Sequence, residues 1–305
     1  MNRLIREDNY ESGKTTLITY DVGGNILSKK EYAVADAETP TGTYTSSDYT
    51  YASTGWKDQL TSFKGETCAY DEIGNPTTYR NHNLTWTKVR RLASFDTNTF
   101  SYNAAGIRTA KNGITYTLDG NKILKQSGNG IDLTFYYGLN GIVGFHYNNT
   151  DYYYAKNLQG DVYEIYAAYY DERICVAKYA YDAWGKIVSI TDGEGNDVSN
   201  DPTHIANINP IRYRSYYYDR ETNLYYLESR YYDPETGRFL NADEYINANG
   251  DMMGYNMYAY CSNNPIMGRD PSGHGLFRNL WNGIVSFGEK VWDTGTTFVE
   301  HFISD

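Results

Sequence analysis

The stretch that decides the fold runs from residue 228 to residue 274 and reads ESRYYDPETGRFLNADEYINANGDMMGYNMYAYCSNNPIMGRDPSGH. It contains strand-forming pieces at 229–232, 238–241 and 255–260. Turn formers separate them, namely Asp233-Pro234, Glu235-Thr236-Gly237, Asn263-Asn264-Pro265 and Asp270-Pro271-Ser272-Gly273. Aromatic runs bounded by Gly, Pro, Asn and Asp are typical of strands joined by tight turns. The stretch therefore predicts a compact β unit.

A degenerate Tyr-Asp-x-x-Gly repeat precedes this unit. Its copies lie at Tyr20-Asp21, Tyr70-Asp71, Tyr102-Asn103 and Tyr181-Asp182, the last ending at Gly185, and more diverged copies lie at 118–121 and 157–161. A strand-ending Tyr, an Asx side chain that bonds its own downstream backbone and a Gly free to take positive φ describe a hairpin turn. Nothing in the repeat supplies a nucleophile or a converging acid and base. We therefore interpret these residues as turns of a long antiparallel sheet.

The RYYDPETGRFL opening at 230–240, the DPSG close at 270–273 and the Tyr-Asp repeat resemble the Rhs and YD-repeat protein family. The resemblance covers residues 1 to 274. It implies an all-β fold in which a curled, spiralling antiparallel sheet of YD-type hairpins makes part of a β-cocoon around a variable C-terminal toxin. It also implies a repeat sheet at 1–191, a polar loop at 192–209, an RHS-associated core block at 210–274 and the start of the variable region at 275–305.

The same resemblance implies a self-cleavage site. In the family an Arg and two Asp residues are implicated, and by motif position these are Arg230, Asp243 and Asp270. Two neighbouring carboxyls can share a proton, so that one activates water while the other acts as an acid. The implied scissile bond joins His274 to Gly275, where the family has Leu in place of His274. The alternative is that both Asp residues only cap turns.

Composition narrows the class of protein. The chain has 305 residues, 40% of them hydrophobic, with 34 Tyr against 10 Phe and 5 Trp. Rings with a hydroxyl suit half-buried sheet faces. A net charge of −11 argues against a nucleic-acid surface. We interpret Arg212, Arg214 and Arg220 as solvated strand and turn charges.

No metal or other cofactor is predicted. The cysteines Cys68, Cys175 and Cys261 are isolated, and the five His residues lack the spacing of zinc ligands. The acidic run from Asp192 to Asp197 has some features of a calcium loop but lacks a Glu at the twelfth position. We interpret it as a polar hairpin tip.

The sequence pattern changes in the segment 275–305. Apolar residues there recur at three- and four-residue spacing: Phe277, Leu280, Trp281, Ile284, Phe287, Val291, Phe298 and Phe302. This pattern predicts an amphipathic helix broken near Gly295. It is too short for a self-contained toxin enzyme. Three interpretations stay open: the first helix of a truncated effector, a helix docked inside the shell, or a helix on a membrane surface.

Two classes of function follow. The first is a shell and delivery segment of a bacterial polymorphic toxin, with no enzymatic activity beyond self-cleavage. Its expected partners are upstream shell segments, its own effector region and an immunity protein, and no signal peptide is visible although a secreted or cell-surface location is expected. The second is a binding module for cell-wall glycan, in which Tyr rows at 152–154 and 216–218 stack on sugar rings.

Overall fold

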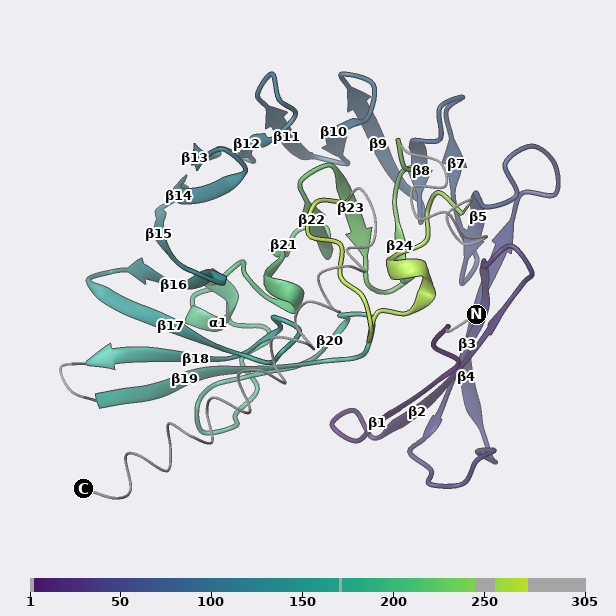
Figure 1. Ribbon diagram of the computed structural model, residues 1–305, viewed down its shortest axis with the longest axis horizontal. Coiled ribbons are helices and arrows are strands. Elements are labelled where there is room, and N and C mark those ends of the chain that lie inside the picture. Colours follow the sequence, from purple (N-terminus) through teal and green to yellow (C-terminus); the bar gives the residue numbers. More distant parts are fainter. Residues whose placement is uncertain (1–2, 170–171, 245–255, 274–305) are drawn as a thin grey trace, which may run out of the picture.

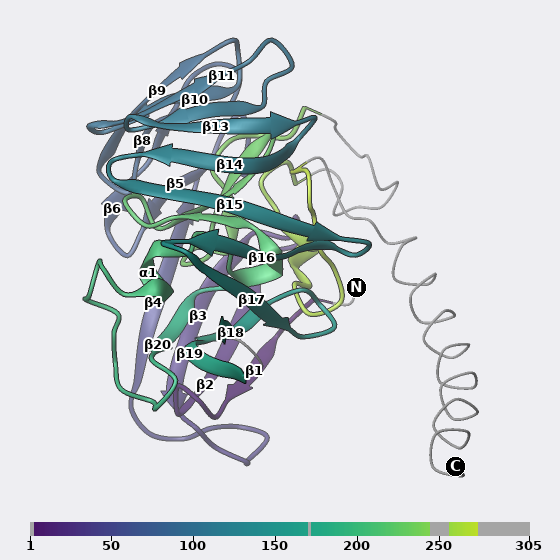
Figure 2. The ribbon, with the colours of Figure 1, turned by 90° about the vertical axis from the view of Figure 1, so that its left-hand side faces the viewer.

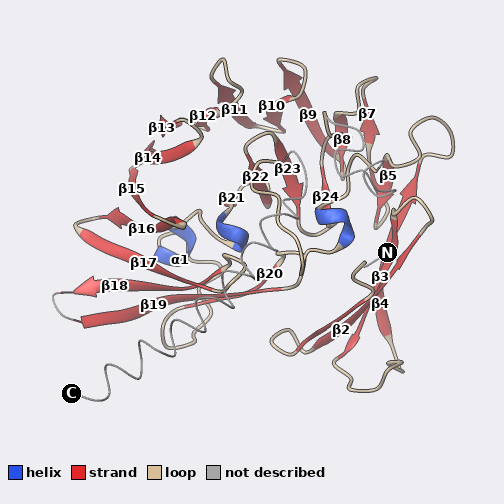
Figure 3. Ribbon diagram, in the orientation of Figure 1, coloured by secondary structure: helices blue, strands red, loops and turns tan. Residues whose placement is uncertain are grey.

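The computed structural model describes residues 3–169, 172–244 and 256–273. Almost all of its regular structure is antiparallel β-strand (Figure 1; Figure 3). The strands of residues 3–191 follow one another in chain order through a six-stranded sheet, β1–β6, and a fourteen-stranded sheet, β7–β20. No helix among the described residues is long and apolar enough to cross a membrane.

The strand bounds are β1 Arg6–Asn9, β2 Lys14–Tyr20, β3 Ile26–Ala33, β4 Tyr44–Tyr51, β5 Leu60–Phe63, β6 Glu66–Thr67, β7 Ala69–Tyr70, β8 Pro76–Tyr79, β9 His82–Thr87, β10 Arg91–Phe95, β11 Asn98–Tyr102, β12 Arg108–Lys111, β13 Ile114–Asp119, β14 Lys122–Gly128, β15 Ile131–Gly138, β16 Gly141–Tyr147, β17 Thr150–Lys156, β18 Val162–Tyr169, β19 Glu172–Tyr181 and β20 Ile187–Thr191. We call β1–β20 the wall. It curls into an arch (Figure 1; Figure 2), which confirms the predicted curled antiparallel sheet.

The two sheets of the wall continue into each other around Cys68. The Cys68 amide donates to the carbonyl of Thr61 at 2.9 Å, and the Asn81 amide donates to the carbonyl of Thr67 at 3.0 Å. Cys68 connects β6 to β7 and Asn81 lies between β8 and β9, so these bonds link the edges of the two sheets where the chain passes from one to the other.

The repeat turns explain why the wall curls. The pairing register shifts by one residue at the repeat Tyr in four places: Thr19/Tyr20, Ala69/Tyr70, Ser101/Tyr102 and Ala180/Tyr181. An extra residue on one strand bends that strand and increases its twist. Repeated at successive hairpins, the bulges turn a flat sheet into an arch.

Each of these turns is closed by its Asx side chain. In the first copy, Asp21 Oδ1 accepts the Asn25 amide at 2.8 Å, and the Gly24 amide donates to the Asp21 carbonyl at 3.3 Å. Gly24 has φ 86°, a conformation open to Gly at little cost. The diverged copy follows the same pattern, since Asn157 Oδ1 accepts the Asp161 amide at 2.9 Å.

The third sheet lies inside the arch (Figure 1) and consists of β21 Tyr217–Asp219, β22 Leu224–Leu227, β23 Arg230–Asp233 and β24 Arg238–Phe239. We call residues 210–273 the core block. Its aromatic centre is closely packed, with Tyr232 and Tyr260 rings 4.1 Å apart and neither side chain exposed. The core block thus fills the concave side of the wall.

Two local predictions differ from the structure. The predicted strand at 255–260 is absent from the described residues 256–260, which form a turn with a single bridge from Ala259 to Arg238. Asn and Met there lack the run of β-formers that a ladder needs. The predicted polar loop at 192–209 contains a short helix, α1, at Ile205–Ile208. The predicted amphipathic helix at 275–305 lies outside the described residues.

Candidate functional site

Arg230 is the centre of the candidate site. It begins β23, its side chain is buried, and its guanidinium carbon lies 3.6 Å from the centre of the Phe239 ring. Its Nη1 donates to the carbonyl of Met257 at 3.1 Å, and its Nε donates to the carbonyl of Gly273. Five fixed N–H donors make a guanidinium suited to holding several chain segments at once.

The two predicted carboxylates meet at this guanidinium. Arg230 Nη2 lies 2.8 Å from Asp243 Oδ2 and 3.5 Å from Asp270 Oδ2. The Asp243 side chain is 12% exposed and that of Asp270 is 2% exposed. Asp243 and Asp270, which follow Arg230 by 13 and 40 positions in the sequence, therefore meet at one nitrogen atom of its side chain. Sequence reasoning named all three, and the structure places them together.

The last described residues are fixed to the same place. Ser229 Oγ donates to the carbonyl of Ser272 at 2.6 Å, and the Ser229 amide donates to that carbonyl at 3.2 Å. Gly273 has φ 72°, and a Cβ there would lie 2.5 Å from Ser229 Oγ and 2.8 Å from the Leu227 carbonyl oxygen. Only Gly fits this position. The predicted scissile residues His274 and Gly275 lie outside the described residues.

Burial and charge oppose each other at Arg230. Burial lowers the pKa of the guanidinium, whereas the carboxylates of Asp243 and Asp270 raise it. A buried cation of this kind is stable only beside anions and good acceptors. The arrangement can orient two carboxyl groups and hold the backbone that leads to residue 274.

The repeat turns act as acceptors for the core block, which the sequence did not reveal. Four turn glycines have carbonyls that accept hydrogen bonds from core-block groups. The bonds run from Asn263 Nδ2 to Gly24 at 2.7 Å, from Tyr258 Oη to Gly74 at 3.0 Å, from Ser215 Oγ to Gly160 at 2.8 Å and from Tyr225 Oη to Gly185 at 2.8 Å. The turns therefore dock the core block as well as reversing the chain.

Buried Arg side chains also join the wall to the core block. The interpretation of Arg212 and Arg214 as solvated charges is wrong, since both are buried. The guanidinium carbon of Arg212 lies 5.2 Å from the ring centre of Tyr179 in β19, and the guanidinium of Arg214 reaches Asp161 of the wall and the Pro265 carbonyl. Alternating charge in a sequence predicted exposure, but the abundant Tyr rings and carbonyls provide buried partners instead.

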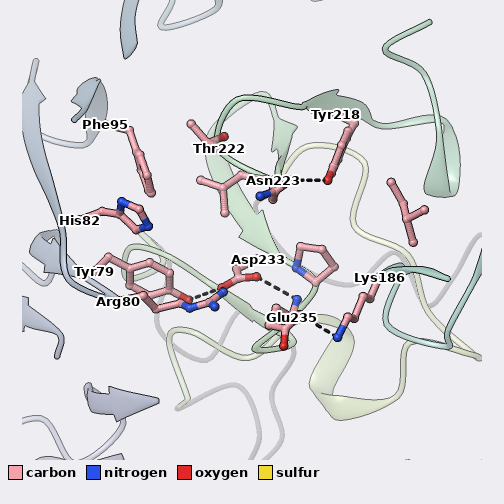
Figure 4. A pocket seen from close by; sticks show the side chains of 13 residues that line it. Tyr79, Arg80, His82, Phe95, Lys186, Tyr218, Thr222, Asn223, Asp233 and Glu235 are labelled. Atoms are coloured by element: carbon pink, nitrogen blue, oxygen red, sulfur yellow. Dashed lines mark hydrogen bonds and ion pairs between the residues drawn. The ribbon is translucent and has the colours of Figure 1, made fainter. Parts of the chain in front are cut away.

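A polar cavity of about 290 Å³ lies between β8–β10 of the wall and the core block (Figure 4). Its charges are already paired. Tyr79 Oη donates to Asp233 Oδ2 at 2.9 Å, Arg80 Nη1 lies 3.4 Å from the same oxygen, and Lys186 Nζ lies 2.9 Å from Glu235. Such pairs hold two layers together, and we assign no reaction to the cavity.

The other predicted features can now be located. Among the described residues no group of three His, Cys, Asp or Glu side chains could hold a metal ion. Asp192 Oδ1 accepts the amides of Glu194 and Asn196, each at 2.9 Å, which is the Asx turn of the repeat. Tyr216 and Tyr217 are buried and do not present rings to solvent, whereas Tyr153 is exposed.

Known proteins are similar to this chain in sequence, and a solved structure is similar to it in fold. The tRNA3(Ser)-specific nuclease WapA of Bacillus spizizenii is 32% identical over 303 residues, which are 94% of this chain and 12% of that protein. Toxin protein Tse5 of Pseudomonas aeruginosa is 44% identical over 64 residues, 21% of this chain and 5% of Tse5. No family model matches the chain.

A solved structure gives the same fold. The crystal structure of TcdB2-TccC3-Cdc42 superposes with a TM-score of 0.65 at 20% identity, over 85% of this chain and 13% of that one. The chain thus spans about one eighth of the length of WapA. The sequence matches and the shared fold together support placing this chain in the Rhs-related polymorphic toxin family.

Proposed function

We propose that this chain is a structural shell and delivery segment of an Rhs-type bacterial polymorphic toxin, and that residues 210–273 are its RHS-associated core block. In this role the wall encloses or presents an effector region that continues beyond Gly273. The observation that carries the proposal is the core block seated inside the arch on four repeat turns. A lining that is hydrogen-bonded to the wall in this way suits a container better than a substrate pocket.

The context of the relatives supports the proposed role. WapA is named a nuclease and Tse5 a toxin, and this chain matches a small part of each. Because most of each relative lies outside the match, we infer that the named activity belongs to another part and that the matched part is a scaffold. We further propose secretion or cell-surface location in bacteria, with upstream shell segments, the effector region and an immunity protein as partners.

The second part of the proposal is self-cleavage after His274. One carboxyl of the Asp243–Asp270 pair takes a proton from water, whose oxygen attacks the His274 carbonyl carbon. The other carboxyl gives its proton to the Gly275 nitrogen as the peptide bond breaks. Arg230 orients both carboxyls, and its bond to the Gly273 carbonyl holds the chain one residue before the scissile bond.

A purely structural role for the same cluster is the second candidate. The bonds of Ser229 to Ser272 and of Arg230 to Gly273 fasten the end of the core block to the β22–β23 turn. A purely structural role requires these contacts but requires neither a bound water nor a reactive carbonyl group. The large distance in sequence between the joined segments favours this role.

One experiment separates the two candidates. The chain is purified and its mass measured over time, for the unchanged protein and for Asp243→Asn and Asp270→Asn. Asp233→Asn is the matched control, because Asp233, like Asp270, is buried, lies in the core block and is followed by Pro. Fragments ending at His274 in the unchanged chain and the control, but in neither test variant, support self-cleavage. An intact mass in every folded sample contradicts self-cleavage and supports the purely structural role of the cluster.

The shell role has its own test. Cryo-electron microscopy of this chain assembled with its proposed shell partners should show further shell segments beside β1 and the core block at one end of an enclosed space. Density with β1–β20 as an isolated arch, or with the core block detached from the repeat turns, would contradict the proposal.

A further inference from the structure

The two ends of the wall touch each other across the arch (Figure 1), and we call this contact the seam. It joins Glu7 and Asn9 of β1 to residues 181–183, where β19 ends and the turn before β20 begins. Glu7 Oε1 accepts the Ala183 amide at 2.7 Å, and Asn9 Nδ2 donates to the Tyr181 carbonyl at 3.1 Å. The bonded residues are 176 and 172 positions apart in the sequence. The seam therefore ties the beginning of the wall to its end.

Three ionisable side chains lie at the seam: Glu7 of β1, Lys29 of β3 and Asp182 of the β19–β20 turn. Glu7 and Asp182 are half-buried, whereas Lys29 is buried. Lys29 Nζ lies 4.7 Å from the ring centre of Trp184, and Asp182 Oδ1 accepts the Trp184 amide at 2.9 Å. Both Glu7 and Lys29 act electrostatically on Asp182, so the three groups lie near one another. A charge that leaves bulk water needs a nearby opposite charge.

The other charged side chains that face these three groups have partners of opposite charge. The pairs are Glu31 of β3 with Lys14, Glu235 of the core block with Lys186 and Lys64, and Asp233 of the core block with Arg80. Among the described residues, Lys29 thus remains as the cation for both Glu7 and Asp182. One positive charge faces two carboxyl groups.

The number of protons at the seam depends on pH. Burial and, after it, the charge of Glu7 raise the pKa of Asp182 to about 7, and burial also raises the pKa of Glu7. Burial lowers the pKa of Lys29, so at high pH this side chain loses its charge earlier than an exposed lysine would. The stability contributed by a raised carboxyl pKa is lost as the pH rises from 3.8 through 7. Below pH 7 one carboxylate balances Lys29, whereas above pH 7 two carboxylates face one cation and repel each other.

We propose that the seam is a pH-dependent contact, which is closed while Glu7 and Asp182 hold one proton between them and opens when both are ionised. Opening breaks the bonds from Ala183 to Glu7 and from Asn9 to Tyr181, so a mildly alkaline medium releases the two ends of the wall from each other. The Asp182 turn itself stays formed, because its carboxylate accepts amides of its own turn. This inference is independent of self-cleavage and of the shell role, since it concerns a contact within this chain.

Residue-resolved amide hydrogen exchange of the whole chain tests the proposal. Protection at pH 6 and at pH 8.5 is compared after correction for the intrinsic pH dependence of exchange. The Ala183 amide reports on the seam, because it donates to Glu7. The Asp182 amide is the internal control, because it donates to the Lys186 carbonyl at 2.9 Å within the same turn. We expect protection of Ala183 to fall on the order of tenfold at pH 8.5, and that of Asp182 to stay unchanged.

Two variants identify the groups that are responsible. Glu7→Gln and Asp182→Asn each remove one carboxylate and keep an oxygen that can accept the same amides. Either variant should keep Ala183 as well protected at pH 8.5 as at pH 6. Asp192→Asn is the matched control, because Asp192 holds the same position in an exposed turn, and it should leave the tenfold loss in place.

Three results would overturn the proposal. The first is equal protection of Ala183 at both pH values in the unchanged chain. The second is an equal loss at the Ala183 and Asp182 amides, which would report unfolding of the whole turn. The third is a pH-dependent loss that persists in both Glu7→Gln and Asp182→Asn. Each result is read only from samples whose circular dichroism matches that of the unchanged chain at pH 6.

Discussion

Arg108 Nη1 of the wall and Asp219 Oδ2 of the core block lie 2.5 Å apart, and neither side chain has any exposed surface. The pair is enclosed by aromatic rings, since the Arg108 guanidinium carbon lies 4.2 Å from the ring centre of Tyr226 and 4.8 Å from that of Tyr217. Lys111 Nζ lies 3.0 Å from the other Asp219 oxygen. A buried network of this kind ties two layers in one register.

Removal of Arg108 should therefore be costly. Arg108→Met leaves the Asp219 carboxylate buried with Lys111 as its remaining cation, and we expect a loss of about 3 kcal/mol in the free energy of unfolding. Urea denaturation followed by circular dichroism measures it. The control is Lys14→Met, which removes a pair with Glu31 in which the Lys14 side chain is 47% exposed, and it should have a small effect. Equal losses in the two variants would contradict the assigned importance of the buried pair.

The contact of a repeat turn with the core block can be separated from backbone strain. Gly185 and Gly195 hold the same turn position with φ 86° and 97°. Alanine at either site should cost about 1–3 kcal/mol through positive φ. A Cβ at 185 would lie 2.5 Å from Tyr213 Cδ1, whereas a Cβ at 195 meets nothing within 4 Å. Gly185→Ala should therefore lose roughly 1–3 kcal/mol more than Gly195→Ala in urea titrations.

A pH-dependent effect is expected at Asp182. Burial and, after it, the charge of Glu7 raise the pKa of Asp182 to about 7, although Lys29 opposes the rise. A raised carboxyl pKa contributes stability at low pH that is lost as the pH rises from 3.8 through 7. Asn fits this turn position, as at Asn103 and Asn157. Asp182→Asn should thus melt at least about 2 °C above the unchanged protein at pH 8, and the difference should be smaller at pH 5.

The matched control for Asp182 is Asp192, which holds the same position in an exposed turn. Hydrogen bonds from the Asn196 side chain and backbone lower the pKa of Asp192, so its ionised form contributes stability above pH 3.8. Asp192→Asn should therefore lower the melting temperature slightly at both pH 5 and pH 8. A rise at pH 8 in both variants would show that burial is not the cause.

The opposite sign is expected at Glu235. Burial raises its pKa, but hydrogen bonds from Lys186 and Lys64 outweigh burial and lower the pKa to about 2. A depressed carboxyl pKa contributes stability above pH 4.5 that is lost as the pH falls toward 2. Glu235→Gln should be less stable than the unchanged protein at pH 6, and the gap should narrow at pH 3. Urea titration at both pH values measures it, with Glu194→Gln as the exposed control.

Local sequence was enough to predict the hairpins. The Asx side chain, the Gly three residues later and the strand-forming flanks all act within a few residues of one another, so Asp21 and Gly24 need no distant partner to make their turn. The same holds for the curled antiparallel sheet, because consecutive hairpins leave each strand beside its sequence neighbour. The motif positions of Arg230, Asp243 and Asp270 were also visible in the sequence.

The missed features depend on distant segments. The strand predicted at 255–260 is replaced by a turn that pairs once with Arg238. Arg212 and Arg214 looked like surface charges, because the ring and carbonyl partners that allow their burial, such as Tyr179 and Pro265, lie many residues away. Propensity and charge pattern report only a residue's neighbours in sequence, and here the tertiary environment overrides them.

The sequence by itself determined that successive Tyr-Asp-x-x-Gly turns would fold residues 1–191 into a continuous antiparallel wall, since turn chemistry and strand pairing between neighbours are local. Only the tertiary structure decided that the carbonyls of those turns receive the core block, and that Arg230 gathers Asp243, Asp270 and the Gly273 carbonyl. The reason is physical: a buried charge or carbonyl must find its partners, and the curl of the whole wall determines which distant groups come within hydrogen-bonding distance.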